Sequence, residues 1–100
     1  MNDFDARGDA DGVLWISGEI DMAVSNRFEV AAAETLDGQR EFVIDLSGAS
    51  FLDSTGIRAI LNTARNTDKG VCLRNPTPNV RKVLDITGIV GRHGIRISDE

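Results

Sequence analysis

The central third of the chain has the clearest pattern of apolar and polar positions. Residues 42–46 are apolar almost without interruption, which is typical of a strand buried on both faces. Further on, apolar residues recur at the i, i+3, i+4, i+7 spacing of one helical face: Ile57, Ile60, Leu61 and Ala64. The polar residues Arg58, Asn62 and Arg65 fall on the opposite face. This pattern predicts a strand over 41–46, a loop, and a helix that runs to about Thr67.

The flanking segments predict further strands and helices. Strands are expected at 4–7 and 13–17, joined by the Asp11-Gly12 turn signal, with Trp15 as a core anchor. Asp21 is expected to cap a helix over 22–36. After the central helix we expect a buried strand at 71–73, a helix capped by Thr77 and ended by Gly88, and a last strand at 95–97.

The resulting element order, β-β-α-β-α-β-α-β, predicts an α/β fold. Strands separated by helices pair in parallel, so the sheet should be mixed but mostly parallel, with the N-terminal hairpin as its antiparallel edge. A chain of 100 residues is expected to form a single domain over 1–100, with its core at about 13–97.

Composition and charge disfavour several classes of function. The net charge of -5 disfavours a nucleic-acid partner, and no apolar run reaches the ~18 residues of a membrane span. Cys72 is the only cysteine and His93 the only histidine, so neither a disulfide nor a metal site is expected, and Cys72 should pack as a small apolar side chain. With no signal peptide at the N-terminus, a cytoplasmic location is expected.

The tetrad Asp53-Ser54-Thr55-Gly56 lies where the loop becomes the central helix. The first N–H groups of a helix lack intrahelical partners and carry partial positive charge, so either Asp53 or Ser54 is a natural N-cap. Gly56 would let the backbone of another protein approach Ser54. Because Asp21 follows one predicted strand and Asp53 the next, both are expected at the same edge of the sheet.

Five segments together resemble a known family: Gly18-Glu19-Ile20-Asp21, Asp45-Leu46 at the end of an aliphatic strand, Phe51-Leu52-Asp53-Ser54-Thr55-Gly56-Ile57, Asn75-Pro76, and Val83-Leu84-Asp85-Ile86-Thr87-Gly88. In order and spacing, from about residue 13 to 88, they are similar to the STAS domain, and more closely to the free-standing bacterial anti-sigma factor antagonists. The combination carries the resemblance, since no single segment is specific by itself.

The resemblance implies a binding module controlled by phosphorylation, and not an enzyme. In that family the serine directly after the aspartate is phosphorylated by an anti-sigma factor that is also a serine/threonine kinase, and a serine phosphatase removes the phosphate. By position the acceptor is Ser54, with Thr55 as the alternative. The docking surface would comprise Asp21, Met22, Asp53, Ser54, Thr55, Gly56 and Arg58. No cofactor is expected on this chain, because ATP and Mg²⁺ would belong to the kinase.

Two features depart from the family pattern, and some alternatives remain open. Arg58 stands where some members have glycine, and the chain stops soon after the last predicted strand. The resemblance also leaves open a weak homodimer and a role as an unphosphorylated STAS subunit that supports a transporter ATPase. A hydrolase that uses Ser54 with His93 and an aspartate is a further alternative, although no Gly-x-Ser-x-Gly motif is present.

Overall fold

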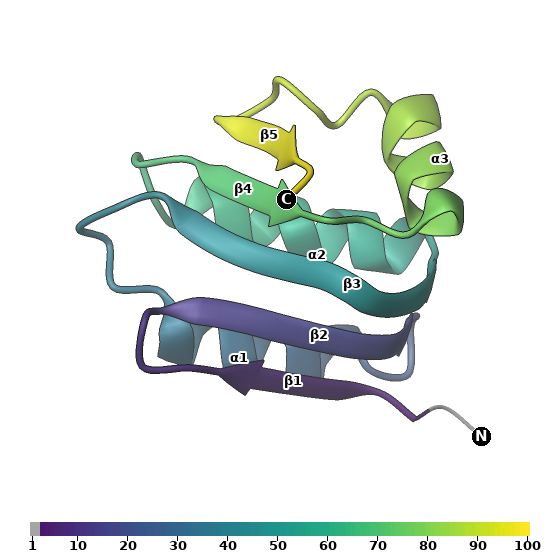
Figure 1. Cartoon of the computed structure of the whole chain (residues 1–100), viewed down its shortest axis with the longest axis horizontal. Coiled ribbons are helices and arrows are strands. Elements are labelled where there is room, and N and C mark those ends of the chain that lie inside the picture. Colours follow the sequence, from purple (N-terminus) through teal and green to yellow (C-terminus); the bar gives the residue numbers. More distant parts are fainter. Residues whose placement is uncertain (1–2) are drawn as a thin grey trace.

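The computed structural model describes residues 3–100 and has the element order predicted from the sequence. The elements are β1 (Asp5–Gly8), β2 (Val13–Ile20), α1 (Ser25–Thr35), β3 (Phe42–Leu52), α2 (Ser54–Arg65), β4 (Val71–Arg74), α3 (Pro78–Thr87) and β5 (Ile95–Ser98). The five strands form one sheet in the order β1-β2-β3-β4-β5 (Figure 1). Only the β1–β2 pair is antiparallel, which confirms the opening hairpin and the mostly parallel sheet.

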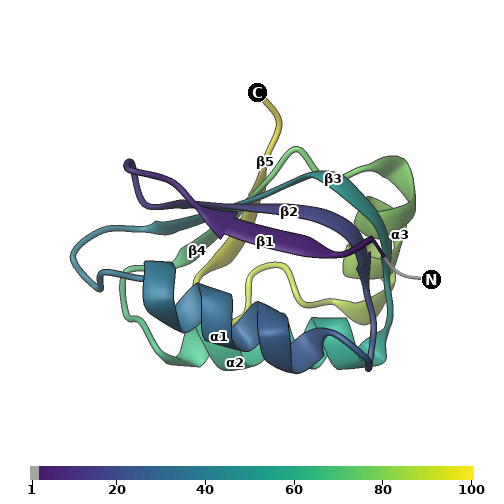
Figure 2. The same ribbon diagram turned by 90° about the horizontal axis from the view of Figure 1, so that it is seen from below.

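Helices α1 and α2 lie side by side and cover one face of the sheet (Figure 2). The buried side chains of that face are in register across the central strands, where Leu14 pairs with Ile44 and Ile44 with Leu73. Helix α3 instead packs at the end of β3 (Figure 1). The core therefore lies between the sheet and the α1–α2 pair, and the other face of the sheet is left without a covering helix.

Trp15 lies on that uncovered face, so the prediction that it anchors the core is wrong. Leu14 and Ile16 on either side of it point into the core, and strand alternation turns the indole outward, where 44% of it is exposed. Its Nε1–H donates to the Asp9 carboxylate at 2.8 Å. The Arg74 guanidinium lies 4.9 Å from the ring centroid. Two polar partners thus fix the orientation of an exposed aromatic side chain.

Strands β2 and β3 are longer than the sequence pattern predicts, and β3 continues through residues 47–52, which read as a loop. Within that segment, Gly48, Ala49, Phe51 and Leu52 pair with β2 across two register shifts. Gly18 lies at one of the shifts with φ 85°, and a Cβ there would come within 2.8 Å of the Phe4 backbone. A bulged strand therefore replaces the expected loop, and α2 follows β3 after a single residue.

The N-termini of helices α1 and α3 also differ from the prediction. Helix α1 begins at Ser25 and not at Met22, because Asp21 closes a turn: its Oδ1 accepts from the Ala23 N–H at 3.0 Å, and its carbonyl accepts from the N–H groups of Val24 and Ser25. Thr77 does occupy the N-cap position of α3, yet its hydroxyl donates to the Ala49 carbonyl of β3 at 2.7 Å. Thr77 therefore ties α3 to the sheet instead of capping it.

Candidate functional site

The carboxyl ends of β2 and β3 meet at one edge of the sheet, at the right of Figure 1. Ile20 pairs with Leu52 in the last register position of the two strands. The next N–H, that of Asp53, donates to the Ile20 carbonyl at 3.2 Å. The turn that starts at Asp21 and the first turn of α2 are therefore neighbours, as expected from the strand order.

Asp53, and not Ser54, is the N-cap of α2. The sequence alone left both residues as candidates. Its Oδ1 accepts from the Thr55 N–H at 2.9 Å, the Gly56 N–H at 3.0 Å and the Thr55 hydroxyl at 2.6 Å. Partial burial raises the pKa of this carboxyl, but these hydrogen bonds and one from the Met22 N–H outweigh burial, so the pKa lies below its ordinary value. Asp53 is thus a fixed negative charge at the start of the helix.

The two hydroxyls that follow Asp53 differ in their surroundings. Ser54 is the first residue of α2 and is exposed. Thr55 is half-buried, and its hydroxyl is bound to Asp53. A group that approaches from solvent therefore meets the Ser54 oxygen directly, whereas access to the Thr55 oxygen requires breaking a hydrogen bond to a carboxylate.

Gly56 is buried, and its lack of a side chain is needed by the chain's own packing. A Cβ at this position would come within 2.7 Å of the Ile20 carbonyl and would overlap the Leu52 side chain. The structure therefore gives Gly56 a different role from the expected space for a partner's backbone. It lets α2 pack tightly against the ends of β2 and β3.

Three further residues of the predicted docking surface lie around this point. Met22, in the turn after β2, is 77% exposed. Asp21 precedes it and is half-buried. Arg58 is exposed on α2, one helical turn beyond Ser54. Phe51, for which no role was predicted, pairs with Glu19 next to this edge and is 45% exposed. Its only signal in the sequence is an aromatic residue directly before the tetrad.

A buried ion pair on the uncovered face of the sheet was also missed. Asp45 is only 2% exposed, and its Oδ2 lies 2.8 Å from Nε of Arg74 on the neighbouring strand. Its Oδ1 accepts from the N–H and the hydroxyl of Ser47. Burial raises the pKa of the Asp45 carboxyl, but the Ser47 and Arg74 hydrogen bonds outweigh it and keep the pKa low. The pair joins β3 to β4 and has the properties of a structural element.

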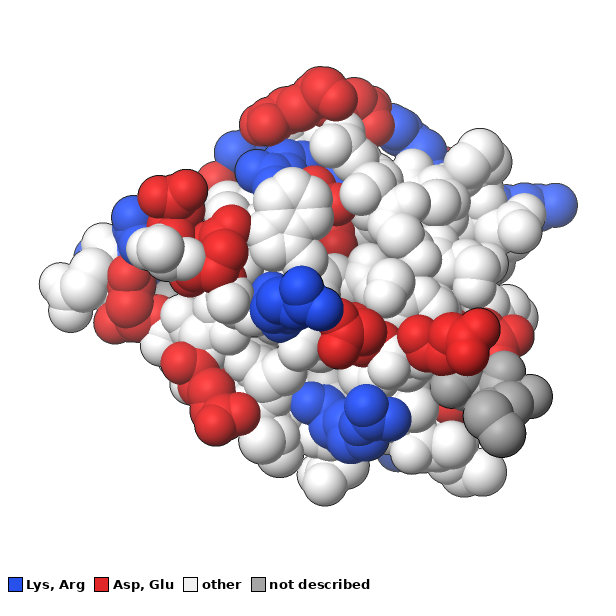
Figure 3. All heavy atoms as spheres, turned by 60° about the horizontal axis from the view of Figure 1, so that its bottom comes forward, with Lys and Arg blue, Asp and Glu red and all other residues white. Residues whose placement is uncertain are grey.

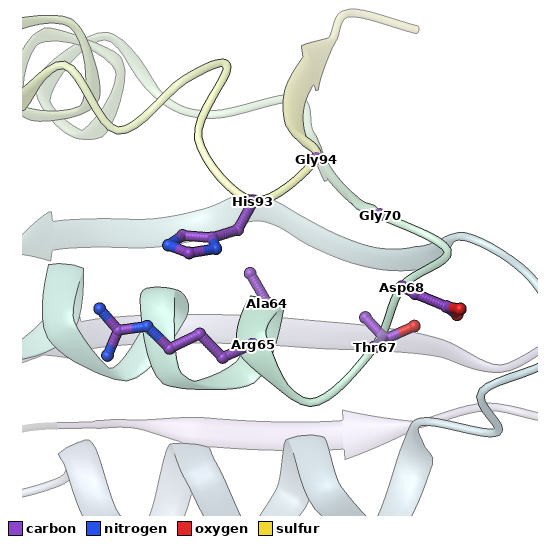
Figure 4. A pocket seen from close by; sticks show the side chains of 7 residues that line it. All are labelled: Ala64, Arg65, Thr67, Asp68, Gly70, His93 and Gly94. Atoms are coloured by element: carbon purple, nitrogen blue, oxygen red, sulfur yellow. The ribbon is translucent and has the colours of Figure 1, made fainter.

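The alternative of a hydrolase with Ser54 and His93 does not fit the geometry. His93 lies over the last turn of α2, in a pocket of about 290 Å³ that is lined by Ala64, Arg65, Thr67, Asp68, Gly70, His93 and Gly94 (Figure 4). Ser54 is at the first turn of the same helix, whose 12 residues span ~18 Å at the usual rise. The two side chains are therefore at opposite ends of α2 and cannot form a nucleophile–base pair.

Charge distribution, possible metal ligands and helix length are the remaining features of the described residues. Acidic and basic side chains are interspersed on the side of the molecule seen in Figure 3, without an extended basic area. Within residues 3–100, no three His, Cys, Asp or Glu side chains come together as metal ligands would. No helix of the same region has the length and apolar character needed to cross a membrane. Cys72 is buried as predicted, and burial raises the pKa of its thiol.

The fold and this edge define a small α/β domain that presents a polar helix start beside two strand ends. The sequence profile of the STAS domain matches residues 4–97, and the chain belongs to the STAS domain family. It is 30% identical over 86 residues to the putative anti-sigma factor antagonist BtrV of Bordetella bronchiseptica, a match that covers 80% of this chain and 74% of that protein.

Solved structures of two other proteins are similar to this chain. An anti-sigma factor antagonist from Mycobacterium paratuberculosis superimposes with a TM-score of 0.77 at 28% identity, covering 96% of this chain and 86% of that one. The murine Solute Carrier 26 family member A9 anion transporter gives a TM-score of 0.65 at 26% identity, covering 87% of this chain and 16% of the transporter. The same fold thus occurs as a protein of similar length and as a small part of a membrane transporter.

Proposed function

We propose that this protein is an anti-sigma factor antagonist whose binding is switched off by phosphorylation of Ser54. Membership of the STAS family and similarity to two proteins named as anti-sigma factor antagonists support the first part. The observation that carries the second part is an exposed serine at the first residue of α2, directly after a capping aspartate.

The surroundings of the two hydroxyls favour Ser54 over Thr55 as the acceptor. Phosphoryl transfer needs an oxygen that can enter the active site of a kinase, attack the γ-phosphorus of ATP and lose its proton to a base there, while ADP leaves. Ser54 is exposed, whereas the Thr55 oxygen donates to Asp53 at 2.6 Å and is half-buried. Use of Thr55 would also remove one of the hydrogen bonds that hold the helix cap.

Electrostatics explain why the phosphate would act as a switch. A phosphate adds ~1.5–2 negative charges at pH 7 beside Asp53, which is itself kept ionised by its hydrogen bonds. Since Asp53 already accepts from the Thr55 and Gly56 N–H groups, the start of the helix offers the phosphate less compensation than a free terminus would. An interface that covers Ser54 would therefore have to desolvate a concentrated negative charge. A penalty of about 3 kcal/mol would weaken binding ~100-fold.

In this proposal the unmodified protein binds an anti-sigma factor serine/threonine kinase and thereby releases its sigma factor. ATP and Mg²⁺ belong to the kinase, and a serine phosphatase restores the binding form. The partner surface would comprise Asp21, Met22 and Arg58 around Asp53, Ser54 and Thr55. Met22 is suited to an anchor, because it is an unbranched apolar side chain that is largely exposed beside the acceptor.

The test is to measure binding to candidate anti-sigma factor kinases from the same genome by calorimetry, for the parent protein, Ser54→Ala and Ser54→Asp. In the presence of ATP, Ser54→Ala should stay bound while the parent dissociates. Ser54→Asp should fold normally and bind poorly. Thr55→Val is the matched control, and it should still dissociate from the kinase when ATP is present. Parent-like binding and release by both Ser54 variants would show that the switch lies elsewhere.

A second candidate function is an unphosphorylated STAS subunit that supports a transporter ATPase. The observation in its favour is the similarity to a region of an anion transporter. Such a protein should copurify with a membrane ATPase, and Ser54→Ala should leave that association unchanged. If Ser54→Ala no longer dissociates from the kinase, and no ATPase is present in the purified complex, the result favours the anti-sigma factor antagonist over the ATPase subunit.

A further inference from the structure

Arg58 is an exposed arginine without a counter-charge. Within the part of the chain that the structure describes, residues 3–100, its guanidinium forms no ion pair and no hydrogen bond. Other arginines of the chain are matched with carboxylates at short distance, as in Arg81 with Asp99 at 2.7 Å and Arg96 with Glu41 at 2.7 Å. The Arg58 guanidinium is therefore available to bind an anion, because the folded monomer does not use it.

The helix places this unused guanidinium one turn beyond Ser54. Residues i and i+4 of an α-helix lie on the same face, and an acidic group at i with a basic group at i+4 is the favourable orientation of such a pair. Ser54 and Arg58 are both exposed, while Ile57 between them is buried. A phosphate on Ser54 would thus stand within reach of a long, flexible cation on the same face of the helix.

The hydrogen bonds at the start of the helix leave the binding of the phosphate to another group. The Thr55 and Gly56 N–H groups, which could otherwise bind an anion at the helix terminus, already donate to Asp53. The Asp53 carboxylate is moreover a like charge next to the phosphate. A phosphoserine here therefore gains more from a cation on the next turn than it would at an uncapped helix.

We propose that Arg58 binds the phosphate of phosphorylated Ser54 within the same chain. The planar guanidinium can donate two parallel hydrogen bonds to phosphate oxygens. The pair stabilises the dianion in the free protein, and it also withdraws Arg58 from the surface offered to a partner. Phosphorylation then changes this face twice, by adding negative charge and by engaging its unpaired cation. This inference rests on Ser54 being the acceptor.

The experiment installs phosphoserine at position 54 during translation, so that no kinase is needed. The second pKa of the phosphate is then measured by ³¹P NMR titration in the phosphorylated full-length parent, in Arg58→Ala and in Arg58→Lys. Arg65→Ala is the matched control, because Arg65 is an exposed arginine on the last residue of the same helix.

We expect Arg58→Ala to raise the second phosphate pKa by about 0.2–0.4, a roughly 1.5- to 2.5-fold change in the dissociation constant, as for an i, i+4 charge pair. Arg58→Lys should restore part of the difference, and Arg65→Ala should leave the pKa as in the parent. The same pKa in Arg58→Ala as in the parent, or equal changes in Arg58→Ala and Arg65→Ala, would overturn the inference. Because the phosphate is installed directly, this outcome is separate from whether any kinase phosphorylates Ser54.

Discussion

The carboxylate of Asp53 accepts a hydrogen bond from the hydroxyl of Thr55 at 2.6 Å, whereas Ser54, the residue between them, is exposed and its hydroxyl forms no hydrogen bond within the described residues. One aspartate therefore does two things. It caps α2, and it distinguishes two adjacent hydroxyls that the sequence alone leaves equivalent. The proposed switch depends on that distinction, because only one of the two oxygens is presented to a partner.

Removal of the cap should cost stability, whereas removal of the Ser54 hydroxyl should not. Asp53→Ala deletes the acceptor of the hydrogen bonds from Thr55, Gly56 and the Met22 N–H, so we expect a loss of about 1–2 kcal/mol in the free energy of unfolding. Ser54→Ala changes an exposed side chain and should stay within about 0.5 kcal/mol of the parent. Urea unfolding followed by circular dichroism measures both. Equal losses in the two variants would mean that Ser54 also has a structural role.

Gly56→Ala should be destabilising although alanine is the better helix former. The added methyl would overlap Leu52 and approach the Ile20 carbonyl, so α2 would have to move away from β2 and β3. We expect a loss of about 1–3 kcal/mol, as in other overpacked sites. Thermal unfolding gives the value. An unchanged or higher melting temperature would show that α2 is packed less tightly than described.

The Asp45–Arg74 pair should matter more for stability than any exposed ion pair. In Asp45→Asn the Arg74 guanidinium, only 16% exposed, loses its 2.8 Å carboxylate partner and keeps only the longer contact with Glu100 at 3.9 Å. We therefore expect a loss of about 2–3 kcal/mol, below the 3–5 kcal/mol typical of a fully buried pair. Asp5→Asn is the control, since its pair with Arg7 is exposed and should change stability by less than about 0.5 kcal/mol. If both variants unfold at the same urea concentration, the buried pair contributes nothing beyond a surface pair.

The lowered pKa values of Asp45 and Asp53 predict a loss of stability in acid. Both carboxyls titrate below their ordinary value of 3.8 in the folded protein, so the unfolded chain binds protons first as the pH falls. Their contribution is complete well above 3.8 and is lost as the pH falls through the folded pKa values. The free energy of unfolding should therefore decline below about pH 4–5, and the decline should be shallower in Asp45→Asn. Constant or rising stability over that range would contradict the assigned hydrogen bonds.

Element order and strand directions could be predicted from the sequence, because apolar periodicity and the alternation of strands with helices determine them, whereas the full order of the five strands in the sheet was not predicted. The carboxyl ends of β2 and β3 were placed at one edge for the same reason. Trp15 was misplaced because size and hydrophobicity indicate burial, while strand alternation between Leu14 and Ile16 decides the actual direction of the side chain. Residues 47–52 were predicted to be a loop because the small residues at 47–50, within a bulged strand, carry no periodic signal.

At the site, the tetrad and its position on α2 followed from the sequence, but the division of roles did not. Both Asp53 and Ser54 are good capping residues, so only the hydrogen bonds reveal which one caps. The packing role of Gly56 depends on Ile20 and Leu52, which approach it only after folding. The Asp45–Arg74 pair likewise joins residues 29 positions apart, a contact that local spacing does not indicate.

The most direct measurement is the position of the phosphate after incubation with a candidate anti-sigma factor kinase, ATP and Mg²⁺. Tryptic cleavage after Arg40 and Arg58 yields a peptide that spans residues 41–58 and carries four hydroxyl residues, Ser47, Ser50, Ser54 and Thr55. Tandem mass spectrometry of this peptide should place a single phosphate on Ser54, and Ser54→Ala should remain unmodified. A phosphate on Thr55 or Ser50 in the parent, or undiminished modification of Ser54→Ala, would contradict the proposed switch.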